Sequence, residues 1–130
     1  MKYQPKTEKE FMCPVEYGLD IFGGKWKSRI ICVLSSTDVM RYNEIRKELV
    51  NITDAVLAVM LKELTADGLL SRTQYNEIPP KVEYALTEKG KAVLPILQSI
   101  CQWSRCQTAD DLNKKLPACK TCLQLSYENY

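Results

Sequence analysis

The chain has 130 residues, of which 45% are hydrophobic and 26% are charged, values that are ordinary for a soluble protein of one domain. The formal net charge is only +2, so composition alone does not indicate a nucleic-acid-binding protein, and any basic surface must be local. No apolar run approaches the length of a membrane span, and residues 1–11 lack the apolar core of a signal peptide. We therefore expect a cytoplasmic protein with no membrane partner.

The first part of the chain predicts a flexible polar arm and three short helices. The arm covers residues 1–12. A first helix is expected over 14–22, because proline suits the first helical position and two glycines follow the last one. A second, amphipathic helix is expected over 25–34, and a third over 41–49.

The most informative segment is a helix followed by a hairpin. The helix is expected over 53–66, because Thr53 can cap its start and a glycine follows its end. Residues 69–75 and 81–86 then predict two strands, joined by a turn that contains two prolines. This order predicts a winged helix-turn-helix, a mainly α fold with a small β-wing (class α+β).

A longer helix is expected over 88–105, with Pro95 either kinking it or marking its first turn. Its apolar surface is too wide for one buried stripe, so part of it needs a partner; the alternative is a helix wrapped by its own tail. A short helix is also expected over 109–116. The predicted organisation is an arm (1–12), a winged helix-turn-helix domain with dimerisation helices (13–106) and a C-terminal tail (107–130).

If the helix over 53–66 enters a major groove, its outward side chains meet the bases. They are small and mostly apolar, so they offer few hydrogen-bond donors to base edges, and DNA shape would also contribute to recognition. Asp54, at the helix start, disfavours contact with phosphate. The candidate base-contacting residues are Asn51, Thr53, Ala55, Ala58 and Lys62.

Other side chains are candidates for contact with the DNA backbone, which would contribute affinity and salt dependence. Arg72 lies at the base of the wing and Lys81 just past its tip, while Arg41 and Tyr42 begin the third helix. For every basic residue the alternative is a solvated surface charge. We prefer that alternative for the other two lysines considered, Lys25 and Lys27.

Several motifs occur in the order found in the HxlR-type regulators, a MarR-like branch of the winged-helix proteins, which this chain resembles over about residues 13–104. The resemblance implies a homodimeric, cytosolic, bacterial transcriptional regulator that binds double-stranded DNA. Its recognition helix would be the helix over 53–66, and its first and last helices would form the dimer. Two recognition helices about 34 Å apart would select an inverted-repeat operator. The main motifs are Gly23-Gly24-Lys25-Trp26, Arg41-Tyr42-Asn43-Glu44-Ile45, Leu61-Lys62-Glu63-Leu64, Asp67-Gly68-Leu69-Leu70-Ser71-Arg72 and Pro79-Pro80-Lys81-Val82-Glu83-Tyr84.

Cys13 is a candidate redox sensor. It precedes a helix N-terminus, whose dipole favours the thiolate. The resemblance to the HxlR-type regulators also implies that it matches the redox-active cysteine of several relatives. Modification there would shift the two halves of a dimer, so an oxidant or a small molecule is the expected effector. The alternative is an unreactive, partly buried thiol.

The remaining cysteines allow several interpretations. Cys32 and Cys101 lie in apolar stretches and suit a core or an interface. Cys119 and Cys122 form a C-x-x-C pair in the tail, which is a candidate disulfide, part of a zinc site with Cys106 and a fourth thiol such as Cys13, or a pair of free thiols. We expect no cofactor and no bound metal.

Three functions remain for comparison. The first is a DNA-binding regulator; the second is a winged-helix module for protein–protein interaction with weak or no DNA binding. The third is a thiol oxidoreductase, although the C-x-x-C pair does not follow a strand in a βαβ context. The chain contains no histidine and no glycine-rich phosphate loop, so we expect no enzyme.

Overall fold

A computed structural model describes the backbone of residues 10–115 and the side chains of residues 10–106. The elements follow one another as α1 (Pro14–Phe22), α2 (Lys27–Leu34), β1 (Met40–Arg41), α3 (Tyr42–Glu48), α4 (Asp54–Ala66), β2 (Leu70–Tyr75), β3 (Lys81–Leu86), α5 (Glu88–Lys91) and α6 (Leu94–Lys115). The expected α+β class is confirmed. Most of the predicted arm and the C-x-x-C pair at Cys119 and Cys122 lie outside the described residues.

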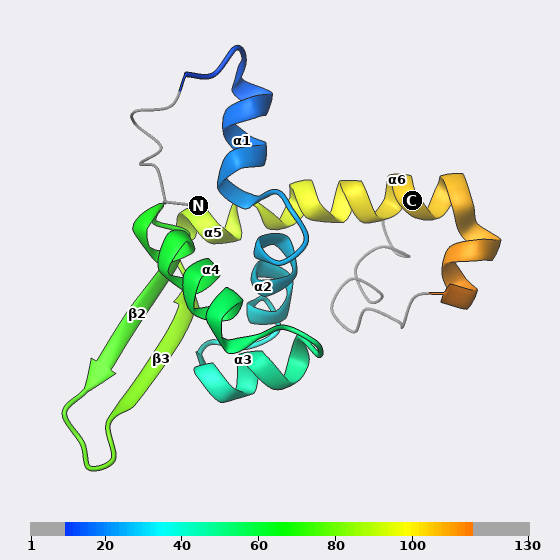
Figure 1. The fold of residues 1–130 in the computed structure, drawn as a ribbon. Helices are drawn as coiled ribbons and strands as arrows, with labels where there is room; N and C mark the ends of the chain where they lie inside the picture. The colour runs from blue at the N-terminus through cyan, green and yellow to red at the C-terminus, as the bar shows by residue number, and fades with distance from the viewer. Residues whose placement is uncertain (1–9, 116–130) are drawn as a thin grey trace.

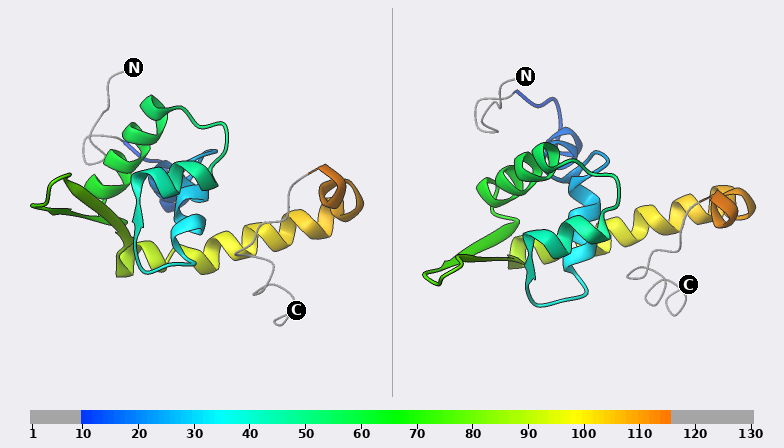
Figure 2. Two further views of the ribbon diagram at one scale, coloured as in Figure 1. Left: turned by 90° about the horizontal axis from the view of Figure 1, so that it is seen from below. Right: turned by 60° about the horizontal axis from the view of Figure 1, so that its bottom comes forward.

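The segment from α2 to β3 (residues 27–86) forms what we call the head (Figure 1). Its helices surround one core, and the β2–β3 hairpin projects from it as a wing. Helix α6 leaves the head on the opposite side from the wing, and α1 projects away from both (Figure 2). Among the described residues, the largest completely buried side chains all belong to the head: Ile30, Ile31, Leu34, Ile45, Leu49, Leu57, Leu61, Leu64 and Leu69.

Helix α4 forms as the sequence predicts. The Thr53 hydroxyl accepts a hydrogen bond from the Val56 backbone N–H (3.2 Å), which satisfies one of the unpaired donors of the first turn. The helix ends at Ala66, before Gly68, whose φ of +83° favours glycine. Its inner side chains at Leu57, Leu61 and Leu64 are buried, whereas the outward face predicted for DNA is exposed.

The sheet has one strand more than the sequence predicts. Met40 and Arg41 form β1, which pairs antiparallel with β3 through Met40 opposite Tyr84 and Arg41 opposite Glu83. The strand order is β1-β3-β2. A strand of two residues is too short to show the alternation that predicts a strand from sequence. Its first residue, Met40, is buried opposite Tyr84.

The single helix expected over 88–105 is wrong. The chain forms α5 and then α6, with Pro95 in the first turn of α6, where its missing N–H has no intrahelical partner to lose. Helix α6 continues to Lys115, so the separate helix expected over 109–116 is also wrong. A Cβ at Gly90 would lie 2.2 Å from the Leu69 carbonyl oxygen, so this close approach of α5 to the base of the wing requires glycine.

Two helices begin later than the sequence predicts. Helix α2 begins at Lys27 instead of residue 25, and α3 begins at Tyr42 instead of residue 41. The break before α2 contains Gly24, whose φ is +87°. Among the described residues, no helix combines the length and the apolarity required to cross a membrane.

Candidate nucleic-acid interface

The turn between α3 and α4 fixes the start of the candidate recognition helix. Asn51 adopts φ = +76°, a left-handed conformation that asparagine tolerates better than most residues. Thr53 follows in an extended conformation and caps α4. The side chains of both candidate residues are exposed, so they are open to a partner at this end of α4.

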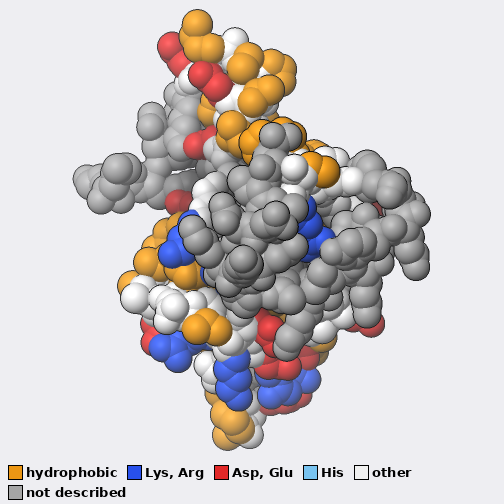
Figure 3. All heavy atoms as spheres, turned by 90° about the vertical axis from the view of Figure 1, so that its right-hand side faces the viewer, with side chains coloured by type: hydrophobic (Ala, Val, Ile, Leu, Met, Phe, Trp, Pro, Cys, Tyr) orange, Lys and Arg blue, Asp and Glu red, His pale blue; other side chains and the backbone are white. Residues whose placement is uncertain are grey.

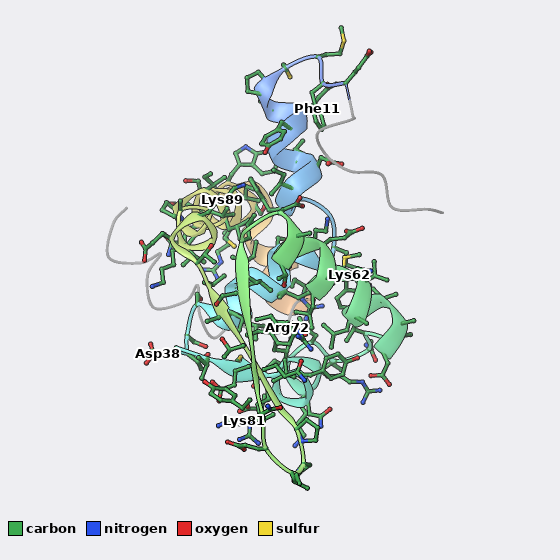
Figure 4. All side chains as sticks on the ribbon, turned by 90° about the vertical axis from the view of Figure 1, so that its left-hand side faces the viewer. Phe11, Asp38, Lys62, Arg72, Lys81 and Lys89 are labelled. Atoms are coloured by element: carbon green, nitrogen blue, oxygen red, sulfur yellow. The ribbon has the colours of Figure 1, made fainter. Side chains whose placement is uncertain are left out.

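The outward face of α4 carries Ala55, Ala58 and Lys62, all exposed. A groove of about 450 Å³ separates this face from the wing. Figure 4 shows Lys62 on α4 and Arg72 on β2, and both side chains line this groove. The lining residues are Tyr42, Ala58, Leu61, Lys62, Thr65, Ala66, Arg72 and Tyr84. Four predicted site residues, Tyr42, Ala58, Lys62 and Arg72, therefore meet in one groove.

Arg72 and Lys81, the two wing residues predicted to contact DNA, do not lie on the same face of the wing. Arg72 is paired with Tyr84 and Tyr75 with Lys81 in the β2–β3 ladder. Residues opposite each other in a ladder share a face, and successive residues alternate. Arg72 therefore points to the α4 side of the wing, and Lys81 to the other side.

On this second face Lys81 already has partners. Its Nζ lies 2.8 Å from Glu83 Oε1 and 5.0 Å from the centre of the Tyr75 ring. The hydrogen bond to Glu83 raises the pKa of Lys81. Arg41 pairs with Glu83 in the β1–β3 ladder, so it belongs to this face as well. Contact between Lys81 and a phosphate would require exchange of its carboxylate partner.

The start of α4 carries a network that sequence reasoning missed. The Tyr42 hydroxyl donates to Asp54 Oδ1 (3.0 Å) and to the Asp54 carbonyl oxygen (3.2 Å). Arg46 Nε lies 2.9 Å from the same Oδ1. Burial and then the hydrogen bond to Asp54 raise the pKa of Tyr42. The negative charge of Asp54 is thus partly compensated by Arg46, and the contacts of Tyr42 and Arg46 with Asp54 join α3 to α4.

The prediction that Lys27 is a solvated surface charge is wrong. Its side chain is buried and its Nζ lies 2.7 Å from Glu63 Oε2. Lys27 therefore joins α2 to α4 inside the head and does not face DNA. Lys25 is exposed, with its Nζ 4.7 Å from the centre of the Trp26 ring.

The outermost elements expose large apolar side chains. On α6, Ile96, Ile100 and Trp103 recur at helical spacing and are exposed, whereas Leu97 of α6 and Val93, just before it, are buried against the head. Helix α1 exposes further apolar residues, and Figure 3 shows hydrophobic side chains gathered there, at the top of the view. The exposed members in and beside α1 are Met12, Val15, Tyr17 and Leu19.

The described cysteines are separate from the groove. Cys13 is exposed at the N-cap position of α1, next to the apolar surface of that helix. Cys32 packs against the core, as expected, while Cys106 is exposed. Within the described part of the chain, no group of three or more cysteine and acidic residues could hold a metal ion. The zinc and disulfide alternatives for Cys119 and Cys122 stay predictions, because that pair lies outside it.

A capped helix on the face of a small head, followed by an antiparallel wing, defines a helix-turn-helix transcriptional regulator. The HxlR-like helix-turn-helix family matches residues 21–115, and the chain belongs to that family. It is 44% identical, over 75% of its own length and 74% of the relative's, to an HTH-type transcriptional regulator of Methanothermobacter thermautotrophicus.

Solved structures support the same assignment. The reduced form of the redox regulator HypR is 39% identical, with a TM-score of 0.69, over 78% of this chain and 99% of that one. A MarR-family transcriptional regulator from Porphyromonas gingivalis W83 is 37% identical, with a TM-score of 0.66, over 74% and 93% of the two chains. The HxlR-type and MarR-like relationship expected from the motifs is therefore confirmed, and the relatives are transcriptional regulators.

Proposed function

We propose that this regulator binds double-stranded DNA sequence-specifically as a homodimer on an inverted-repeat operator, and that it responds to thiol oxidation through Cys13. The observation that carries the DNA proposal is the groove between α4 and the wing. There, Lys62 and Arg72 line the same groove as the exposed Ala58 of α4. A helix whose outward side chains are small can approach base edges closely, while the two cations compensate phosphate charge.

The apolar surfaces of α1 and α6 support the homodimer. Exposed apolar surface at helical spacing is typical of an interface, and a second copy of the chain offers the same surface in return. The spacing between the two recognition helices would then fix the spacing of the operator half-sites.

The position of Cys13 supports the redox proposal. The thiol is exposed and begins α1 beside the surface assigned to the dimer. A modification there changes packing between protomers and thereby the relative position of their recognition helices. The redox regulator HypR, which this chain resembles, makes an oxidant the first effector to test.

The test is binding to the DNA upstream of the protein's own gene, measured with and without a mild thiol oxidant, on the wild type and on Cys13→Ser. We expect tight, salt-sensitive binding when the wild type is reduced, loss of that binding on oxidation, and retention in Cys13→Ser under both conditions. Binding that is indifferent to oxidant would contradict the redox proposal and leave the DNA proposal standing.

A protein–protein interaction module is the second candidate. It is favoured by the lack of donors on Ala55 and Ala58 and by the carboxylate already paired with Lys81. Replacement of both Arg72 and Lys81 by alanine distinguishes the two functions. Loss of DNA retention supports the regulator, whereas unchanged retention supports the interaction module.

A further inference from the structure

The carboxylate of Asp54 is held in one orientation at the start of α4. The Tyr42 hydroxyl (3.0 Å) and Arg46 Nε (2.9 Å) both approach the same oxygen, Oδ1. The Asp54 side chain is 68% exposed, so much of the carboxylate stays accessible to a partner.

The charges around Asp54 allow it to lie close to DNA. An isolated carboxylate would be repelled by phosphates, but Arg46 pairs with this one, and the first turn of a helix stabilises negative charge. The Tyr42 hydroxyl is protonated at neutral pH, as any tyrosine hydroxyl is, so it donates to Asp54. The neighbouring outward residues of the helix, Ala55 and Ala58, have no polar side-chain atoms. Asp54 therefore provides the polar group of the first turn of α4, next to the exposed Asn51 and Thr53 that precede it.

We propose that Asp54 determines base specificity, with Oδ2 accepting a hydrogen bond from the exocyclic amino group of a cytosine in the major groove. This inference rests on the proposed DNA-binding function. A carboxylate can only accept, and the major groove offers amino donors only on cytosine and adenine. The adenine amino group lies between two acceptors, N7 of adenine and O4 of the paired thymine, which repel a carboxylate. Cytosine has an acceptor on one side only and is therefore preferred.

Tyr42 and Arg46 are positioning residues in this arrangement. Because their donors occupy Oδ1, an asparagine at residue 54 would place its amide oxygen there and turn its NH₂ group toward the DNA. The exposed acceptor would become a donor. Asp54→Asn is therefore expected to change the preferred base from cytosine to one that presents an acceptor, guanine or thymine.

The experiment is selection of bound duplexes from a random library by the full chain, for the wild type, Asp54→Asn and the control Asp38→Asn. Asp38 is an exposed carboxylate before β1, well away from Lys62 in Figure 4, and its replacement removes the same charge. Binding to single-base variants of the selected operator then gives the preference at each position, and thermal unfolding of each variant checks its fold.

We expect the wild type and Asp38→Asn to share a cytosine at one symmetric position of each half-site. Substitution of that base should weaken wild-type binding about tenfold, and Asp54→Asn should change the preference there and nowhere else. A variant that binds all sequences more tightly by the same factor, or keeps the wild-type preference at every position, would overturn the assignment of Asp54 alone. Absence of salt-sensitive DNA binding by the wild type would overturn the proposed function as well.

Discussion

The head and the outer helices differ in where their apolar side chains lie. In the head, Leu57, Leu61 and Leu64 of α4 are buried in the core, and most outward side chains of this helix are small or polar, with the exposed Val59 as an exception. In α1 and α6, side chains such as Val15 and Ile100 are exposed. The head provides most of the core, to which Ile21 of α1, Val93 before α6 and Leu97 of α6 also contribute, whereas the outer helices expose surface that a second copy can cover. Folding and dimerisation are therefore expected to respond to different substitutions.

The largest effect is expected in the core of the head. Leu57→Ala removes a completely buried side chain and should lower the free energy of unfolding by about 2–5 kcal/mol. Val59→Ala, on the exposed side of the same helix, should change it by less than about 0.5 kcal/mol. Chemical denaturation of both variants provides the comparison. Equal losses in the two variants would mean that α4 does not pack as described.

The next largest effect is expected from a substitution on the exposed apolar surface of α6, which should leave the fold of the head unchanged. Ile100→Glu places a charge on the exposed stripe of α6 and should convert the dimer into a monomer. Loss of the second recognition helix should weaken operator binding about a hundredfold. Val39→Glu is the matched control, because Val39 is 48% exposed and Ile100 is 49% exposed, yet Val39 lies in the head. Sedimentation velocity shows the oligomeric state, and an unchanged mass for Ile100→Glu would contradict this use of α6.

A smaller effect separates the two faces of the wing. Arg72→Ala removes the cation that faces the groove and should weaken DNA binding about tenfold, with a decrease of about one in the slope of log affinity against log salt. Lys81→Ala should have a smaller effect, since Lys81 is paired with Glu83 on the opposite face. Fluorescence anisotropy over a salt series measures both. A larger loss for Lys81→Ala would show that the other face of the wing contacts the DNA.

The smallest effect is a pH dependence of stability. The pKa of Tyr42 is raised above its ordinary value of 10.0, so the folded state holds the hydroxyl proton more firmly than the unfolded state does. The stabilisation is fully present below pH 10 and is lost as pH rises through the folded pKa. Because the Tyr42 hydroxyl donates to Asp54, wild type should exceed Tyr42→Phe in stability at neutral pH, and the difference should decrease above pH 10. A difference that stays constant to higher pH would contradict the role of this hydroxyl.

Much of the head could be predicted because its signals are local. Thr53, the glycine after α4 and the alternation in 81–86 each act over a few residues, and the helix and strands they specify are present. The shared motifs also predicted the family. The outer helices were predicted less well. Pro95 suits either a kink or a first turn, and the close approach of Gly90 to the Leu69 carbonyl depends on tertiary packing that the linear pattern does not show.

The site was predicted as a set of residues but not as a geometry. Nothing in the linear pattern indicates that Arg46 of α3 pairs with Asp54 across a turn, because the contact depends on how two helices cross. The separation of Arg72 from Lys81 follows from the register of the hairpin, which a proline-containing turn does not specify. The burial of Lys27 likewise depends on Glu63, which lies on another helix.

The measurement that tests the central claim most directly is the stoichiometry and salt dependence of binding to the DNA upstream of the gene. Sedimentation of the reduced protein with a duplex from this region measures both at once. We predict two protomers per operator and an affinity that falls steeply as salt rises. A complex that contains a single protomer would contradict the dimer, and the absence of any salt-sensitive complex would contradict the assignment of α4 and the wing to DNA.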